Sequence, residues 1–388
     1  MADEKRIKVL IVTNSLGCGG AEIQLARLAN CFDKEPFDIQ AAYYDKVGIA
    51  HPAGLLADSG VKVTYLNRPK WGRIPYLFKA AAFIKHERFD IVHAWHGSAN
   101  YYATIPAMMA HVPVIVGGLR GKHGSAFAWT LRAIINLGCD YWITNAERTK
   151  EIALQKMKFL KPEHIAVVPN GIEIDDESIF KQDTKTFYDS VLSNKPVVGI
   201  VGRLTRLKNH LLFIEMAKGL VESGCNADFW IIGDGEMRAE TVQAIEKYGL
   251  TKHVKLLGYR KDVDAALSRM DVFVLTSDSE SCPNVLLEAM RASLPVVSTN
   301  CTNLDDIIED GVNGYIVDVG NAETLVQKVS VLLSSAERKK MMGLCSRRIV
   351  EKRFGMPVAV KRLGNAYLDC LRLVRGRNKK LRIKLETF

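Results

Sequence analysis

The chain has 388 residues, of which 48% are hydrophobic and 25% are charged, a globular composition with enough apolar residues for two cores. Eight scattered cysteines, with no closely spaced pair, fit neither a disulfide framework nor a zinc site, and they are typical of a reducing compartment. No run of about 18 apolar residues is present to cross a bilayer, and the charged start does not resemble a signal peptide. We therefore expect a cytoplasmic location.

The net charge of +10 is concentrated at the C-terminal end, where residues 371–388 hold seven Lys or Arg and one Glu and so carry +6. Basic residues interleaved with Leu and Ile fit a solvated tail, or a peripheral contact of Arg372–Lys384 with the anionic inner face of a membrane. The segment 73–88 sets Arg and Lys beside an apolar face and allows the same two interpretations. No nucleic-acid-binding motif accompanies the charge, so we expect no nucleic-acid partner.

Short apolar runs alternate with amphipathic helical stretches, a pattern that predicts βαβ units and parallel sheets. The predicted strands of the first half are 7–13, 37–44, 61–66, 90–95, 112–118, 140–145 and 164–170, with helices between them at, for example, 21–32 and 74–86. The polar stretch 173–195 has no sustained period and predicts a linker. Beyond it, the predicted strands are 196–202, 228–234, 254–258, 271–277 and 294–300, and the predicted helices are 321–334, 336–353 and 357–375.

This order predicts an α/β fold of two Rossmann-like, doubly wound parallel-sheet domains that face each other across a cleft. We expect residues 1–190 to form the N-terminal domain with the linker, and residues 191–355 to form the C-terminal domain. The segment 356–375 is predicted to be a helix that crosses back to the N-terminal domain. Residues 376–388 form the basic tail.

A glycine-rich loop follows the first predicted strand, where residues 14–22 read NSLGCGGAE. Glycines at a strand-to-helix turn let backbone N–H groups approach a phosphate. The dinucleotide fingerprint G-x-G-x-x-G is not completed, because Glu22 stands at the place of its third glycine. A nicotinamide enzyme is therefore disfavoured, and a tight turn without a ligand remains an alternative.

A basic loop, GRLTRLKNH at 202–210, follows the first strand of the second half. It gathers Arg203, Arg206 and Lys208 at a strand-to-helix turn, where the backbone already favours anions. Guanidinium and ammonium groups together suit a diphosphate. The alternative is an ordinary basic loop.

Two further turns follow strands, IIGDGEMR at 231–238 and LLGYRKDV at 256–263. Either can close over a nucleobase, although both are also ordinary turn chemistry. The acid-x-acid pattern of Asp262 and Asp264 lies at a helix start, so we interpret it as capping and charge rather than as a metal site.

Two carboxylates surround a predicted helix start in SESCPNVLLEAM, residues 279–290. Pro283 suits the first turn, with Ser281 or Cys282 as the cap. In one interpretation Glu280 complements the helix dipole and Glu288 lies on a solvated face. In the other, both bind hydroxyls of one ligand whose anionic part sits on the helix N-terminus.

The basic loop followed by Glu280 and Glu288 around a proline resembles the retaining GT-B glycosyltransferases of glycosyltransferase family 4, also called glycosyl transferases group 1. The resemblance extends over nearly the whole chain, through the Gly-Gly-Ala-Glu loop, PNGI at 169–172 and IGDGE. It implies an acceptor-side N-terminal domain and a nucleotide-sugar donor domain at the C-terminal side. The segments 45–60, 67–75 and 117–130 match nothing that identifies the acceptor.

The resemblance implies a role for each matching residue. Arg203 and Lys208 would neutralise the diphosphate and make it a better leaving group. Glu280 would bind the hydroxyls of the transferred sugar, and Glu288 would bind the ribose. The other implied donor contacts are Gly19, Gly20 and Asp234, the turn from Tyr259 to Val263 against the base, and the N–H groups of Asn284 and Val285.

Two residues of the first half complete the candidate site. His96 follows a predicted strand, at the place where the family has a histidine that faces the sugar, so we expect it to be catalytic with Arg203, Lys208 and Glu280. The neighbouring His93 alternates to the opposite side and is expected in the core. Arg120 ends another strand and is an acceptor-side candidate.

These residues predict a metal-independent, cofactor-free transferase that moves a hexosyl or N-acetylhexosaminyl unit from a nucleotide sugar to a hydroxyl acceptor, with retention. We favour a UDP-sugar donor and a glycan or lipid-linked acceptor in surface polysaccharide or glycolipid assembly. A GDP-mannose-dependent mannosyltransferase is an alternative. A nucleotide-sugar epimerase, which shares the twin-Rossmann shape, is an alternative of another class.

Overall fold

The computed structural model describes residues 6–16, 20–32, 36–45, 60–68, 73–97, 99–120, 136–174, 188, 193–302 and 304–377. The chain divides into two compact units, Met1–Gly171 with Met356–Phe388, and Ile172–Gly355. The division after Gly171 differs from the predicted boundary at 190. The chain after Gly171 is held by the second unit, because Ile172 N–H donates to the carbonyl of Phe354 (2.8 Å) and Tyr188 is buried in the second unit's core.

The first unit is built on a parallel sheet whose strand order is β3-β2-β1-β4-β5-β6-β7. Its strands are β1 (Ile7–Thr13), β2 (Phe37–Tyr43), β3 (Val63–Tyr65), β4 (Ile91–Ala94), β5 (Val114–Leu119), β6 (Tyr141–Thr144) and β7 (Ile165–Val167). Its helices are α1 (Gly20–Cys31), α3 (Arg73–Glu87), α4 (Ala99–Met109), α6 (Glu147–Lys156) and α14 (Met356–Arg377), with short 3₁₀ turns at Asn136–Gly138 and Pro162–His164. The predicted strand at 164–170 is shorter, because the chain leaves the sheet after Val167.

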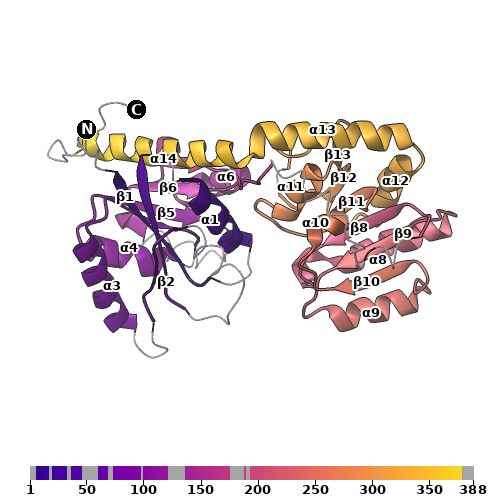
Figure 1. Ribbon diagram of the computed structural model, residues 1–388, viewed down its shortest axis with the longest axis horizontal. Helices are drawn as coiled ribbons and strands as arrows, with labels where there is room; N and C mark the ends of the chain where they lie inside the picture. Colours follow the sequence, from indigo (N-terminus) through magenta and orange to yellow (C-terminus); the bar gives the residue numbers. More distant parts are fainter. Residues whose placement is uncertain are drawn as a thin grey trace. The chain divides into compact units, whose positions relative to one another are not determined.

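Both faces of this sheet are covered, and the alternation of side chains along β1 shows how. Val9 and Ile11 belong to a core shared with α1 and α14, whereas Leu10 and Val12 belong to a core shared with α3 and α4. Such a strand reads as a continuous apolar run because both of its faces are buried. In Figure 1, α14 runs in yellow along the first unit.

The α14 helix belongs to the first unit by its packing. Leu363 and Tyr367 are fully buried in the core that it shares with α1, and the Tyr367 hydroxyl lies 2.8 Å from Nδ1 of the buried His93 on β4. His93 is therefore a core residue, as its alternation predicts, and burial lowers its pKa to about 3.

The second unit is built on a parallel sheet of order β10-β9-β8-β11-β12-β13. Its strands are β8 (Val197–Val201), β9 (Asp228–Ile232), β10 (Val254–Gly258), β11 (Val272–Leu275), β12 (Val296–Thr299) and β13 (Gly314–Val317). Its helices are α8 (His210–Glu222), α9 (Arg238–Lys247), α10 (Val263–Leu267), α11 (Asn284–Arg291), α12 (Ala322–Leu333) and α13 (Ala336–Phe354), with a 3₁₀ turn at Arg206–Lys208. The predicted fold of two doubly wound parallel sheets is confirmed.

Two further properties of the described residues concern the cysteines and the length and polarity of the helices. All seven described cysteines are free thiols. None of the helices in the described ranges is long and apolar enough to cross a membrane.

Candidate functional site

Each sheet has one place where the strand order reverses, between β1 and β4 in the first unit and between β8 and β11 in the second. The loops that leave neighbouring parallel strands there run to opposite sides, so a crevice opens outside their carboxyl ends. In doubly wound folds, ligands bind at this switch point.

The basic loop of the second unit lies at its switch point and is attached to the loop after β11. Asn209 takes the left-handed conformation (φ 46°), which asparagine tolerates, and its side chain caps α8. Thr276 Oγ1 lies 3.1 Å from the carbonyl oxygen of Lys208 and 2.9 Å from that of Asn209. The Asp278 N–H donates to the Leu207 carbonyl (2.8 Å), and Asn209 Nδ2 donates to the Asp278 carboxylate (2.8 Å). These bonds give the loop a fixed shape.

Lys208 and Glu280 meet across this switch point. The Lys208 ammonium donates to Glu280 Oε1, and Ser277 Oγ donates to the same oxygen at 3.0 Å. The Glu280 N–H in turn donates to the carbonyl of Cys301 at the end of β12 (3.2 Å). The sequence assigned the two side chains to different parts of one ligand, and the structure places them in direct contact, half-buried at 26% and 17% side-chain exposure.

Arg203 stands exposed in the same loop, immediately after the end of β8. Within the described part of the chain no carboxylate forms an ion pair with it. Its positive charge is therefore presented to solvent on the loop that also carries Lys208, where an anionic ligand can reach it.

The helix that follows Glu280 begins one residue later than the sequence predicted. Pro283 is the N-cap residue and α11 starts at Asn284, so neither Ser281 nor Cys282 is the cap. The first N–H groups of a helix, here those of Asn284 and Val285, have no intrahelical acceptor one turn earlier, and they carry the positive end of the helix dipole. Glu288 lies half-buried about one turn further along α11.

Two glycines of the IGDG turn permit the close approach of β9 to the basic loop. A Cβ on Gly233, whose φ is 142°, would lie 1.9 Å from the Gly202 carbonyl oxygen, and a Cβ on Gly235 would lie 2.4 Å from that of Leu204. Asp234 between them is exposed, and its carbonyl accepts from the Leu204 N–H (3.1 Å). The turn therefore needs its glycines in order to shape the loop that carries Lys208.

The turn after β10 presents an aromatic ring to solvent. Tyr259 is 63% exposed, while Val263, the first residue of α10, packs against the core of the second unit. Asp262 is at the N-cap position of α10, but its side chain makes no cap hydrogen bond. Arg260 instead donates two hydrogen bonds to the Asp262 carboxylate (3.0 and 2.8 Å) and lowers the pKa of that carboxyl group.

The acid-x-acid pattern is used for ion pairs. Asp262 pairs with Arg260, and Asp264 pairs with the buried Arg291 of α11. Over the described ranges, no group of three or more His, Cys, Asp or Glu side chains is close enough together to hold a metal ion.

His96 lies at the switch point of the first unit, two residues beyond β4. Its Nε2 is 2.9 Å from Asn14 Oδ1 and 3.1 Å from Thr13 Oγ1, both at the end of β1. Burial and the positive charge of Arg120 lower its pKa to about 4, so the imidazole is neutral near pH 7. The sequence identified His96 but missed its partner Asn14, which belongs to the glycine-rich loop and is the first polar residue after β1.

Arg120 is buried just beyond β5. Its guanidinium lies over the Trp95 ring at 3.9 Å from the centroid, and its NH1 donates to Asn170 Oδ1 (2.9 Å) in the PNGI motif. Gln24 bonds both the N–H and the carbonyl of Gly171 (2.9 and 2.8 Å). Arg120 thereby joins the end of β5 to the PNGI motif, and Gln24 joins α1 to the same motif; the sequence marked Arg120 only as an acceptor-side candidate.

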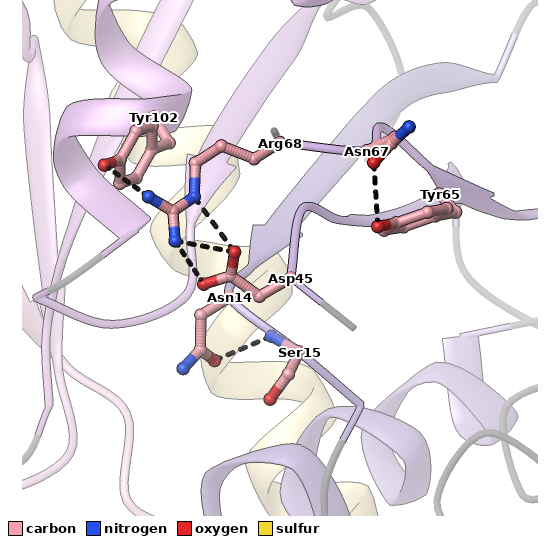
Figure 2. A network of polar contacts seen from close by, with 7 residues as sticks. All are labelled: Asn14, Ser15, Asp45, Tyr65, Asn67, Arg68 and Tyr102. Carbon is pink, nitrogen blue, oxygen red and sulfur yellow. Dashed lines mark hydrogen bonds and ion pairs between the residues drawn. The ribbon is translucent and has the colours of Figure 1, made fainter. Parts of the chain in front are cut away.

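A second polar cluster lies beyond the ends of β2 and β3, where the Asp45 N–H donates to the Asn14 carbonyl (2.7 Å). Arg68 grips the Asp45 carboxylate with its Nε and NH2 groups (2.7–2.9 Å) and donates from NH1 to the Tyr102 hydroxyl (3.1 Å), as Figure 2 shows. Asp45 and Arg68 fall at the edges of the segments 45–60 and 67–75, which match nothing that identifies the acceptor. In the sequence they are single polar residues between apolar runs, and nothing in that pattern indicates that their side chains are in contact.

The glycine-rich loop is described in part. Gly20 is the first residue of α1, which places it at a helix N-terminus after β1. Gly19 lies outside the described residues.

Two family models match the chain, and together they span most of it. Residues 18–176 match the family described as Glycosyltransferase Family 4, and residues 183–348 match Glycosyl transferases group 1. The boundary between the two matches falls in the polar stretch 173–195, a few residues after the division between the units.

Curated relatives and solved structures agree with these matches. The chain is 28% identical over 302 residues to an Escherichia coli protein named UDP-Gal:alpha-D-GlcNAc-diphosphoundecaprenol alpha-1,3-galactosyltransferase, covering 74% of this chain and 77% of that one. It is 24% identical over 313 residues to the Staphylococcus aureus capsular polysaccharide biosynthesis glycosyltransferase CapM, covering 78% and 82%. The crystal structure of Anabaena Alr3699/HepE in complex with UDP-glucose superposes with a TM-score of 0.81 at 21% identity, covering 94% of this chain and 100% of that one.

The buried histidines predict that stability falls with acid. Burial lowers the pKa of His96 and of His210 to about 4, whereas the unfolded chain takes up these protons near pH 6.5. Above pH 6.5 neither state is protonated; below it the unfolded state binds more protons, so the free energy of unfolding falls by up to about 1.4 kcal/mol per pH unit for each histidine until about pH 4.

Urea titrations from pH 7 to pH 4.5 measure this slope. His96→Gln should have a shallower slope than the unsubstituted protein, whereas substitution of the exposed His86 (His86→Gln) should leave it unchanged. Equal slopes for all three proteins would contradict the assignment.

Proposed function

Because this chain belongs to the group 1 glycosyltransferases of family 4, we propose that it transfers a hexosyl or N-acetylhexosaminyl unit from a UDP-sugar to a hydroxyl acceptor, with retention and without a metal ion. The observation that carries this proposal is the contact of Lys208 with Glu280 at the switch point of the second sheet, with the exposed Arg203 on the same loop as Lys208 and the start of α11 four residues after Glu280. Membership of a transferase family removes the epimerase alternative.

The charges at this switch point suit a nucleoside diphosphate that leaves an anomeric carbon. As the bond from that carbon to the diphosphate oxygen breaks, negative charge collects on the diphosphate. Lys208, Arg203 and the first N–H groups of α11 stand ready to stabilise it. Fixed charges of this kind need little reorganisation, because the bonds from Thr276 and Asp278 already hold the loop.

We assign each of the two carboxylates, Glu280 and Glu288, to a different sugar of the donor. Glu280 accepts hydrogen bonds at Oε1 from Lys208 and Ser277, and we assign its carboxylate to the hydroxyls of the transferred sugar. Lys208 then bridges this carboxylate and the diphosphate. Glu288, further along α11, is assigned to the ribose hydroxyls, and Tyr259–Val263 to the base. In the first unit, His96 is assigned to the transferred sugar, Gly19 and Gly20 to the donor phosphates, and Arg120 to the acceptor side.

The choice of donor and acceptor rests on the relatives. The E. coli relative is named for UDP-galactose and for a diphosphoundecaprenol-linked acceptor, and the Anabaena protein binds UDP-glucose. We propose the same class for this chain, a UDP-hexose or UDP-N-acetylhexosamine and a glycan or lipid-linked acceptor of surface polysaccharide assembly. A screen in which GDP-mannose, and no UDP-sugar, raises the melting temperature would assign the donor to the mannosyltransferase alternative.

Loss of the cations should remove most of the activity while the fold persists. Removal of one charged donor at a developing anion costs about 10²–10³ in rate, so Lys208→Ala and Arg203→Ala should each lower UDP release from the best donor by that factor. Glu288→Ala should mainly raise KM for the donor, because a ribose contact is made equally in the ground and transition states. A chelator should leave the rate unchanged.

The matched control is Lys218→Ala. Lys218 is also ion-paired with a glutamate, Glu222, but it lies on the outer surface of α8, so its loss should leave the rate unchanged. Wild-type turnover in both Lys208→Ala and Arg203→Ala, or in one of them together with an unchanged donor KM in Glu288→Ala, would contradict the site assignment. A large loss of rate with chelator would contradict the metal-independent mechanism.

We also propose that the basic end, Arg372–Lys384, makes a peripheral contact with the inner face of an anionic membrane. Its residues beyond Arg377 lie outside the described residues. The charge of +6 over residues 371–388 supports the proposal, since each basic residue near an anionic surface contributes about 1 kcal/mol.

Sedimentation with vesicles tests this contact. The protein should bind phosphatidylglycerol vesicles and leave phosphatidylcholine vesicles unbound, and replacement of Lys379, Lys380, Arg382 and Lys384 by Gln should abolish binding. A control with Lys79→Gln and Lys85→Gln on α3 should keep it. Binding lost in the α3 control alone would move the contact to α3.

A further inference from the structure

Asn14 and His96 lie on the two sides of the first unit's switch point and are joined by their side chains. Asn14 follows the last residue of β1, and His96 follows β4 by two residues. The imidazole Nε2 is 2.9 Å from the carboxamide oxygen of Asn14, the shortest of the side-chain contacts described for that nitrogen.

The identity of the Asn14 oxygen follows from a second bond. The Ser15 N–H donates to the same Oδ1 at 2.8 Å, and a carboxamide NH₂ could not accept it. Oδ1 is therefore an acceptor, and Nε2 of His96 must be the donor to it. The Asn14 N–H also points to Nε2, but at 3.4 Å that contact is much weaker than the 2.9 Å bond.

The imidazole carries a single proton. It is buried, and the positive charge of Arg120, just beyond β5, disfavours a second proton; the side chains described in contact with its Nε2, those of Thr13 and Asn14 at the end of β1, are neutral. A neutral imidazole with its proton on Nε2 has its lone pair on Nδ1.

We propose that Asn14 is a positioning residue that holds His96 as the neutral Nε2–H tautomer, so that a substrate hydroxyl that meets His96 does so by donating to Nδ1. The importance of this tautomer for transfer rests on the proposed function, in which His96 contacts the transferred sugar. The tautomer itself follows from the bonds around Asn14.

The backbone of Asn14 is fixed independently of its side chain. Its carbonyl oxygen accepts from the N–H groups of Tyr44 (3.1 Å) and Asp45 (2.7 Å). The Asp45 carboxylate in turn forms an ion pair with the Arg68 guanidinium, and Figure 2 shows Asn14 and Ser15 beside this ion pair. Because these bonds use the main-chain carbonyl of Asn14, a substitution at this position removes the side-chain carboxamide and leaves the bonds to Tyr44 and Asp45 in place.

Nitrogen-15 NMR of the full chain at pH 7 tests the proposal, with the His96 signals assigned by comparison with His96→Gln. In the unsubstituted protein, Nε2 of His96 should be protonated and Nδ1 should be unprotonated. In Asn14→Ala the two tautomers should become mixed. In Asn14→Asp the carboxylate should raise the pKa of His96 by about 1–3 units, seen as a titration shifted toward neutral pH.

Thr13→Val is the matched control, because it removes the other side-chain contact described for Nε2, and a hydroxyl can either donate or accept. It should leave Nε2 protonated. If Asn14→Ala does not fold, Asn14→Asp, which keeps the size of the side chain, carries the test through its titration.

Three results would overturn the proposal: a proton on Nδ1 in the unsubstituted protein, a tautomer unchanged in Asn14→Ala, or a switch caused by Thr13→Val alone. Failure of the proposed function looks different. If His96→Gln transfers sugar at the normal rate, His96 loses its role in the reaction while the tautomer assignment stands.

Discussion

The parallel direction of the strands is the constraint on which the site depends. In each sheet all carboxyl ends meet at one edge, and the reversal of strand order leaves one place there where two loops diverge. In the second unit this place holds Lys208 and Glu280, which are far apart in sequence and share an ion pair. A doubly wound sheet thereby gathers, at one edge, groups that no local structure would bring together.

The ion pair also explains how a strongly basic loop stays ordered before a ligand arrives. Lys208 donates to Glu280, and Thr276 donates to carbonyls of the same loop, so the ammonium group is held in place. Arg203 adds a cation that no described carboxylate pairs with. The close approach of Gly233 and Gly235 to this loop ties its shape to the next strand, where any side chain larger than hydrogen would collide with a carbonyl.

Much of the fold was predictable from sequence because strands buried on both faces read as apolar runs, and the runs at 7–13 and 254–258 match β1 and β10 in full. The two units divide after Gly171 rather than at 190, and the polar pattern of 173–195 hides Tyr188, whose ring is buried in the second core. Local pattern cannot show which core such a residue joins.

The candidate site was predictable where charge and glycine stand in a strand-to-helix loop, as with Lys208 and Glu280. Contacts made across the sheet were not predictable. Asn14 bonds His96 over 82 positions of sequence, and Arg68 meets Asp45 between two loops that carry no motif. The helix start at Asn284 differed by one residue, because the proline takes the extended backbone of an N-cap rather than the first helical position.

A crystal structure of the protein with UDP tests the central claim most directly, that the switch point of the second sheet is the nucleotide-sugar site. The diphosphate should lie within hydrogen-bonding distance of Lys208 and of the first N–H groups of α11, with the ribose hydroxyls on Glu288. UDP bound at the end of β1 in the first unit, with the Lys208–Glu280 pair untouched, would contradict it.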